Sequence, residues 1–261
     1  MRRVRREASP GHGWDSEVSS GLALAGFLAL VFVAVTLLAI GPLAKFDAYF
    51  TLAPPPSSWL PVLYVLDRVG QRAVCLPVLA LVALALCWKY RTLRPAVVAA
   101  AAVFALNLLV LVLKVTLGRE GPYTVDPSFF NGGMAYPSGH SANIVLVYGL
   151  CVYLISRYAA PSRRTHALLW GAVAALAVTM LVTSLTLDWH WFADLVAGFI
   201  VGGVVLELTA SIDRAVPQVQ LPALRRHRVV ELVETTHPPP FEDVGVRPLT
   251  RPPATTKSSD H

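Results

Sequence analysis

Long apolar runs alternate with short polar segments along most of the chain. Six of these runs are about 20 residues long, which is the length that an α-helix needs to cross the hydrocarbon core of a bilayer. They cover residues 21–42, 73–90, 95–113, 141–158, 167–187 and 195–212. The pattern therefore predicts an all-α, polytopic membrane protein with six transmembrane helices.

Charged side chains are scarce within this part of the chain. Between Gly21 and Ile212, only 18 of 192 residues are Asp, Glu, Lys or Arg, whereas about 25% of the residues of a soluble domain are charged. This scarcity excludes a water-soluble globule and a disordered chain. The net charge of +6 resides largely in loops beside the apolar runs, which is typical of membrane topology rather than of nucleic-acid binding. We expect a membrane lipid, and no nucleic acid, as the partner.

The basic residues also predict the orientation in the membrane. They cluster before the first run, between the second and third, between the fourth and fifth, and after the sixth. With six spans, all four clusters lie on one side, which the positive-inside rule makes cytoplasmic. We expect both termini in the cytoplasm, a basic segment over 1–20, a six-helix domain over 21–212 and a proline-rich, disordered tail over 213–261. Segment 54–72 is predicted to form an amphipathic helix on the outer surface.

Reactive side chains gather in the loops assigned to the outer side. His190 and Asp194 are four residues apart at the start of the sixth run, and helical spacing places them on one face. An aspartate that accepts a hydrogen bond from one imidazole nitrogen leaves the other nitrogen free to attack. Taken alone, the pair is more typical of an interfacial histidine beside an aspartate that stabilises a helix N-terminus.

A second group of candidate residues lies between the third and fourth runs. Ser138, Gly139 and His140 precede a predicted helix, where free backbone N–H groups bind anions and a histidine can protonate a leaving oxygen. The same residues also fit an ordinary serine N-cap. Lys114 ends the third run and Arg119 follows it. Lys114 fits either a phosphate ligand or an anchor that extends to the interface.

In this order, the segments Lys114…Pro122, Pro137-Ser138-Gly139-His140 and His190-x-x-x-Asp194 resemble the three-part signature of the type-2 phosphatidate phosphatase superfamily. That superfamily contains integral-membrane lipid phosphate phosphatases and soluble vanadium haloperoxidases, and the resemblance covers residues 95–205. It implies that His190 is the nucleophile, that Asp194 orients it and that His140 is the general acid. The phosphate-binding residues that it implies are Lys114, Arg119, Ser138, Gly139 and Ser184.

Two positions depart from the family pattern. The first motif has an arginine where this chain has Gly121, and the third motif has one where this chain has Ser184. A charge-assisted contact to phosphate is worth about 1.5–3 kcal/mol, so the two losses would weaken activity. Arg119 lies two residues before the first position and can replace one arginine. We also consider that Arg68 or Arg72, from the outer segment, fills the place of the other.

The resemblance implies a phosphatase that needs neither metal nor cofactor and acts at the outer face of the plasma membrane. It would hydrolyse a phosphomonoester or pyrophosphate of a phospholipid or polyprenyl carrier through a phosphohistidine. Phosphatidate, phosphatidylglycerol phosphate and undecaprenyl pyrophosphate are candidates. A phosphotransferase of the same fold and an inactive relative that binds lipid phosphate stay open as alternatives. A transporter is disfavoured because the polar groups lie at the predicted membrane border rather than at the midplane.

Overall fold

The structure, a computed structural model, describes residues 11–42, 44–50, 52–124 and 126–216. Every regular element within these residues is helical, which confirms the predicted all-α class. The predicted tail lies outside the described residues from position 217 onward. The elements are α1 (Gly11–Ile40), α2 (Ala44–Asp47), η1 (Ala48–Phe50), η2 (Ser57–Trp59), α3 (Leu60–Asp67), η3 (Arg68–Gly70), α4 (Arg72–Tyr90), α5 (Arg94–Leu117), η4 (Pro122–Thr124), α6 (Gly139–Asn143), the π-helical turn η5 (Ile144–Tyr148), α7 (Gly149–Ala159), α8 (Arg163–Thr186) and α9 (Phe192–Ala215).

Six helical segments in the described part of the chain are long and apolar enough to cross a membrane, as predicted. They are Ser16–Ile40, Arg72–Tyr90, Arg94–Thr124, Gly139–Ala159, Arg163–Thr186 and Phe192–Ala215. The third runs furthest past its predicted end, and the first begins before residue 21 because helix α1 extends into the segment 1–20. Helix α1 contains several serines near its start. Its serine hydroxyls bond inside the helix, where Ser19 and Ser20 donate to the Ser16 carbonyl at 3.2 and 2.6 Å. These polar side chains thus find their hydrogen-bond partner on the helix itself.

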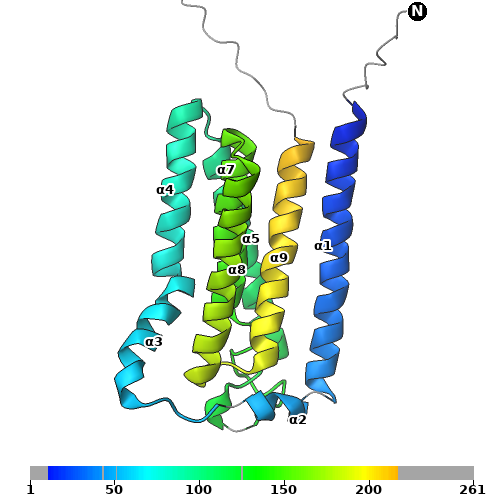
Figure 1. Ribbon diagram of the computed structural model, residues 1–261. Helices are drawn as coiled ribbons and strands as arrows, with labels where there is room; N and C mark the ends of the chain where they lie inside the picture. Colours follow the sequence, from blue (N-terminus) through cyan, green and yellow to red (C-terminus); the bar gives the residue numbers. More distant parts are fainter. Residues whose placement is uncertain (1–10, 43, 51, 125, 217–261) are drawn as a thin grey trace, which may run out of the picture. The chain divides into compact units, whose positions relative to one another are not determined.

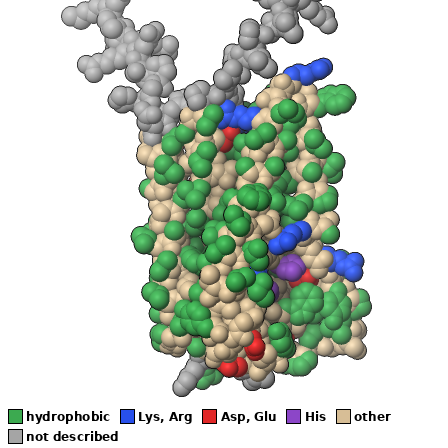
Figure 2. All heavy atoms as spheres, turned by 180° about the vertical axis from the view of Figure 1, so that it is seen from behind, with side chains coloured by type: hydrophobic (Ala, Val, Ile, Leu, Met, Phe, Trp, Pro, Cys, Tyr) green, Lys and Arg blue, Asp and Glu red, His purple; other side chains and the backbone are tan. Residues whose placement is uncertain are grey.

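Large apolar side chains are exposed along the outside of the helical bundle. Leu30, Leu81 and Phe104 are 71%, 70% and 70% exposed, and Figure 2 shows green hydrophobic side chains over much of the bundle's length. Water-soluble proteins rarely carry so extensive an apolar surface. Together with the six spans, this surface is that of a multi-pass membrane protein.

The fourth and sixth spans form the centre of the bundle. About half of each is buried, compared with about a fifth of the others. Two glycines of α9 allow α6 to approach closely, since a Cβ on Gly198 would lie 2.4 Å from the Ser138 carbonyl oxygen and one on Gly202 would lie 2.6 Å from that of Ala142. Small residues with this spacing are a common basis of close helix packing in membranes. The packing places the Ser138–His140 segment directly against the start of α9.

Different elements lie at the two ends of the bundle. The start of α1 and the end of α9 lie at one end, while α2, α3 and the longer connections lie at the other (Figure 1). At the first end, Asp213 accepts hydrogen bonds from Arg94 Nε at 2.6 Å and from the Tyr153 hydroxyl at 2.7 Å, which tie α5, α7 and α9 together. Because the number of spans is even, the start of the first span and the end of the sixth must lie at the same end of the bundle. Which end faces the cytoplasm stays a prediction.

The predicted amphipathic helix is shorter than segment 54–72. Its helical part consists of η2, α3 and η3 and ends at Gly70. It begins only at Ser57, because the three prolines before it offer no N–H groups for helix bonds. Trp59, Val62 and Val65 are 61%, 60% and 63% exposed, while the buried residues Leu63 and Asp67 face the bundle. The segment therefore presents an apolar outer side, as its pattern predicts.

Candidate active site

The predicted pair His190 and Asp194 meets at the start of α9. Helix α9 begins at Phe192, so His190 lies before the helix and the helical-spacing argument was wrong about its backbone. The two side chains nevertheless come together, with His190 Nδ1 3.4 Å from Asp194 Oδ2. The same oxygen accepts a hydrogen bond from the Trp191 N–H at 3.0 Å, which satisfies a free donor of the first turn. Asp194 is fully buried, and the His190 side chain is 13% exposed.

Arg119 holds the other oxygen of Asp194. Its Nη1 donates to Asp194 Oδ1 at 2.7 Å, its Nη2 donates to Asp47 Oδ2 at 2.6 Å and its Nε donates to the Pro127 carbonyl at 3.0 Å. The side chain is fully buried and lies over the rings of Phe129 and Trp191. The structure thus brings Arg119 to the predicted site, but to the carboxylates behind His190 rather than to an open phosphate position.

Asp47 is a site residue that the sequence argument missed. It ends α2, and its Oδ1 accepts a hydrogen bond from the Ala193 N–H of α9 at 3.0 Å. Burial raises the pKa of Asp47 above its ordinary value, and the neighbouring Arg119 guanidinium works against that rise. Asp47 therefore links the connection after α1 to both Arg119 and the start of α9. A lone aspartate in a loop carries no local signal of such a role.

The Ser138–His140 segment is hydrogen-bonded to the first turn of α9. The Ser138 N–H donates to the Asp194 carbonyl at 2.9 Å, and the Ser138 hydroxyl caps α6 by accepting from the Ser141 N–H at 3.4 Å. Both groups of Ser138 are thus engaged with protein atoms. Gly139 borders open space, since a Cβ there would meet no described atom within 4 Å. A phosphate oxygen can approach this backbone without steric conflict.

Tyr136, just before this segment, anchors it to the first span. Its hydroxyl shares a hydrogen bond of 2.7 Å with Thr36 Oγ1, and its ring lies 5.1 Å from that of Phe129. Burial raises the pKa of Tyr136 to about 12, so the phenol remains neutral at physiological pH. Tyr136 therefore has a structural role, which is to hold the Ser138–His140 segment against the first span.

The side chains of Lys114 and His140 are partly exposed. The side of the site on which they lie is the open side. Lys114 lies in the last turn of α5 and donates a hydrogen bond to the Met134 carbonyl. It lies within electrostatic range of Asp194 and of Arg72, and His140 lies within range of Lys114, Arg72 and His190. Figure 2 shows blue Lys or Arg side chains around a purple His and a red acidic side chain in the lower half of the bundle.

Ser184 lies outside this open side. It is fully buried, and its hydroxyl donates to Met180 Sδ at 3.3 Å, one turn earlier in α8. The structure therefore does not bring the Ser184 hydroxyl to the predicted phosphate position. No group of three or more His, Cys, Asp or Glu side chains in the described ranges is arranged to hold a metal ion.

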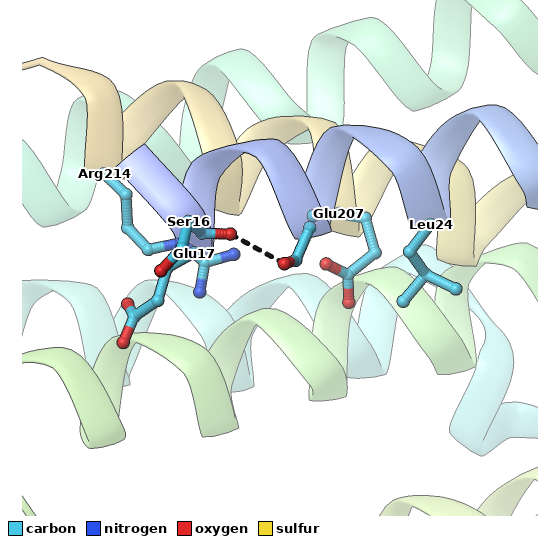
Figure 3. Close-up of a pocket in the computed structure, with 7 residues that line it drawn as sticks. Ser16, Glu17, Leu24, Glu207 and Arg214 are labelled. Carbon is cyan, nitrogen blue, oxygen red and sulfur yellow. Dashed lines mark hydrogen bonds between the residues drawn. The ribbon is translucent and has the colours of Figure 1, made fainter. Parts of the chain in front are cut away.

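A separate pocket of about 320 Å³ lies at the opposite end of the bundle, between α1 and α9 (Figure 3). It is lined by Ser16, Glu17, Ser20, Gly21, Leu24, Glu207 and Arg214. None of the predicted site residues lines it, so the candidate chemistry belongs to the Lys114–His140–His190 side.

Comparison with known proteins gives a family match and a similar fold. Residues 95–216, which contain Lys114, His140 and His190, match the PAP2 superfamily. The fold is similar to the crystal structure of a transmembrane PAP2-type phosphatidylglycerolphosphate phosphatase from Bacillus subtilis. The TM-score is 0.64 and the sequence identity is 20%, over 75% of this chain and 98% of that chain. No curated protein gives a significant match.

Proposed function

We propose that this chain, whose residues 95–216 match the PAP2 superfamily, is a membrane phosphatase that acts on a lipid phosphate. Family and fold support a membrane lipid phosphatase in general. The observation that carries the proposal for this chain is the His190–Asp194 pair, with His140 within electrostatic range of His190 across the open side. A nucleophile, a residue that orients it and a proton donor are the parts that such hydrolysis needs.

The proposed reaction proceeds through a phosphohistidine. Because Nδ1 of His190 faces Asp194, Nε2 is the nitrogen that attacks phosphorus. The new P–N bond forms as the P–O bond to the lipid breaks, and His140 gives a proton to the leaving oxygen. Water then attacks the phosphohistidine, loses a proton to His140 and releases inorganic phosphate. Asp194 stabilises the positive charge on His190 in both steps.

Cationic and backbone groups would hold the phosphate. We propose Lys114 and the Gly139 backbone as direct ligands, since Lys114 lies on the open side and Gly139 borders free space. Arg72 is a further candidate, because its charge acts on both Lys114 and His140. Arg119 and Ser184 are assigned structural roles instead, because their polar atoms bond to protein groups in the interior. Ser138 positions this backbone through its cap.

The substrate class follows from where the site lies along the helices. His140 lies at the start of the fourth span, His190 lies just before the sixth, and Lys114 lies in the last turn of α5, the positions at which we expect a lipid headgroup to meet water. We propose a phosphomonoester or pyrophosphate of a phospholipid or polyprenyl carrier, cleaved at the outer face of the plasma membrane without metal. The carboxylates of the site are engaged by Arg119 and by backbone N–H groups, and positioned cations carry the phosphate charge.

Phosphate release by the detergent-purified protein tests the proposal. The substrates are phosphatidate, phosphatidylglycerol phosphate and undecaprenyl pyrophosphate, each with EDTA present. We expect release from at least one lipid and a loss of about 10³-fold or more in His190→Ala, because the nucleophile is removed. Acid quenching of the wild-type reaction with labelled lipid should trap label on the protein, and His190→Ala should trap none.

A matched histidine variant controls for nonspecific damage. His166 is exposed near the start of α8, at the far end of the bundle, so His166→Ala should retain wild-type turnover. Release that persists in His190→Ala would contradict the phosphohistidine mechanism. Binding of lipid phosphate without any release would favour the inactive relative, and label transfer to an added acceptor would favour the phosphotransferase.

A further inference from the structure

A buried aspartate that no motif includes lies beside His140. Asp67, the last residue of α3, is fully buried, and its Oδ2 is 3.7 Å from His140 Nε2. Gln71 Nε2 donates to the same oxygen at 3.2 Å. Neither Asp67 Oδ1 nor His140 Nε2 has a hydrogen-bond partner among the described residues. The two unsatisfied atoms thus belong to neighbouring side chains.

Burial of a carboxylate is costly unless a positive charge or hydrogen bonds compensate it. Within the described ranges, no lysine or arginine forms an ion pair with Asp67, and the ion pair that it does form is with His140. The imidazolium form of His140 is therefore the counter-charge that this carboxylate has available.

His140 needs a negative neighbour for a second reason. Lys114 of α5, Arg72 of α4 and His190 before α9 all act on it with positive or potentially positive charge, and Asp67 is the anion that opposes them. In a site lined with cations for phosphate, a second protonated group is disfavoured unless a carboxylate stands beside it.

The position of Asp67 relative to His140 is fixed by the turn that follows α3. Asn143 Nδ2 donates to the Gly70 carbonyl at 3.1 Å, and the Tyr148 hydroxyl donates to the Val69 carbonyl at 3.0 Å. A Cβ on Gly70 would lie 3.0 Å from His140 Cβ. The η3 turn is thereby held against the start of the fourth span, so the carboxylate stays beside the imidazole.

We propose that Asp67 is a positioning residue that favours the protonated form of His140 and holds it aimed at the leaving group. The proposal rests on the function proposed above. As the P–O bond breaks, the His140 imidazolium transfers its proton to the leaving oxygen, and neutral imidazole remains beside the Asp67 carboxylate. The carboxylate keeps its charge throughout, and the next proton reaches His140 from the attacking water.

The dependence of turnover on the leaving group tests this role. p-Nitrophenolate leaves without a proton, whereas the leaving oxygen of a lipid phosphate needs one, so a fault in general acid catalysis slows the lipid selectively. We expect Asp67→Asn to lower kcat about tenfold or more on the panel lipid that the wild type hydrolyses. On p-nitrophenyl phosphate, the change should stay within about threefold. Turnover of the second substrate also reports that the variant is folded.

Two further variants sharpen the test. His140→Gln should slow both substrates, because His140 also accepts the proton of the attacking water, and it should slow the lipid more than p-nitrophenyl phosphate. The double variant Asp67→Asn/His140→Gln should be no slower on the lipid than His140→Gln, because Asp67 acts through His140. Asp126→Asn is the matched control, since Asp126 is exposed and bonds to Ser128, and it should leave both rates unchanged.

The outcomes separate the two proposals. An equal fall on both substrates in Asp67→Asn, or no fall, overturns the role of Asp67 while the phosphatase proposal stands. A wild type that releases phosphate from neither substrate overturns both. If Asp67→Asn is not recovered folded, Gln71→Leu carries the test, because it removes the hydrogen bond to the carboxylate. A selective loss on the lipid in Gln71→Leu supports the role, and an equal loss or none overturns it.

Discussion

Arg119 donates to two buried carboxylates at once, Asp194 and Asp47. A guanidinium can bridge them because its donors form a rigid fork, whereas a lysine ammonium is a point charge on a flexible chain. We therefore expect Arg119→Lys to misplace Asp194 and His190, and to lower kcat by about 10²-fold with little change in KM. Steady-state kinetics on the lipid substrate measure both constants.

The sequence argument assigned Arg119 to the phosphate, which predicts the opposite kinetic pattern. A large rise in KM at unchanged kcat would restore that assignment, because a lost phosphate contact weakens binding of the substrate. Arg163→Lys is the matched control. Arg163 is exposed at the start of α8, far from the site, and its replacement should change neither constant.

At the scale of the elements, the packing of α6 on α9 decides whether the site forms. A Cβ on Gly198 would lie 2.4 Å from the Ser138 carbonyl oxygen and 2.9 Å from Ser141 Cβ. Gly198→Ala must therefore push the two spans apart, at a cost of about 1–3 kcal/mol in the free energy of unfolding. We expect a lower Tm in detergent and reduced turnover, because the segment before His140 moves away from Asp194.

Gly171 provides the comparison for this prediction. It lies in α8, and a Cβ at that position would meet no described atom within 4 Å. Gly171→Ala should leave turnover unchanged and keep or raise the Tm, since alanine favours a helix by about 1 kcal/mol relative to glycine. Equal effects of the two substitutions would show that close approach of α6 and α9 does not matter.

At the scale of the whole molecule, six spans place α2, α3 and the long connections on one side and the ends of the described chain on the other (Figure 1). The basic clusters predict that the second side is cytoplasmic. In a variant without Cys75, Cys87 and Cys151, we expect Asp126→Cys to react with an impermeant maleimide in sealed vesicles that expose the outer face.

The converse reaction completes the topology experiment. Arg164 is exposed at the start of the fifth span, at the end opposite Asp126, so Arg164→Cys should react only after the vesicles are opened. The reverse labelling pattern would place His140 and His190 on the cytoplasmic side, and lipid hydrolysis with them. Labelling of both positions in sealed vesicles would contradict a membrane crossing by the fourth span, Gly139–Ala159, which lies between them.

Much of the candidate site could be predicted because its parts are local in the chain. His190 and Asp194 lie four residues apart, Ser138 to His140 are consecutive, and the structure brings both segments together. The partners Asp47 and Asp67 could not be predicted in this way. Each is one carboxylate in a short segment between two spans, and its role depends on contacts with residues far along the chain, Arg119 for the first and His140 for the second.

The amino-acid sequence by itself determined the all-α class, the six spans and the resemblance of the motifs to one family, because the length of an apolar run and the spacing within a motif are properties of contiguous residues. The tertiary structure decided which charges neutralise one another. Arg119 lies two residues before Gly121, the position at which the family motif has an arginine. Its side chain nevertheless points into the interior, where it donates to two carboxylates from distant segments of the chain. In a buried environment, an ion pair forms only where both partners converge, and that convergence depends on how the helices pack.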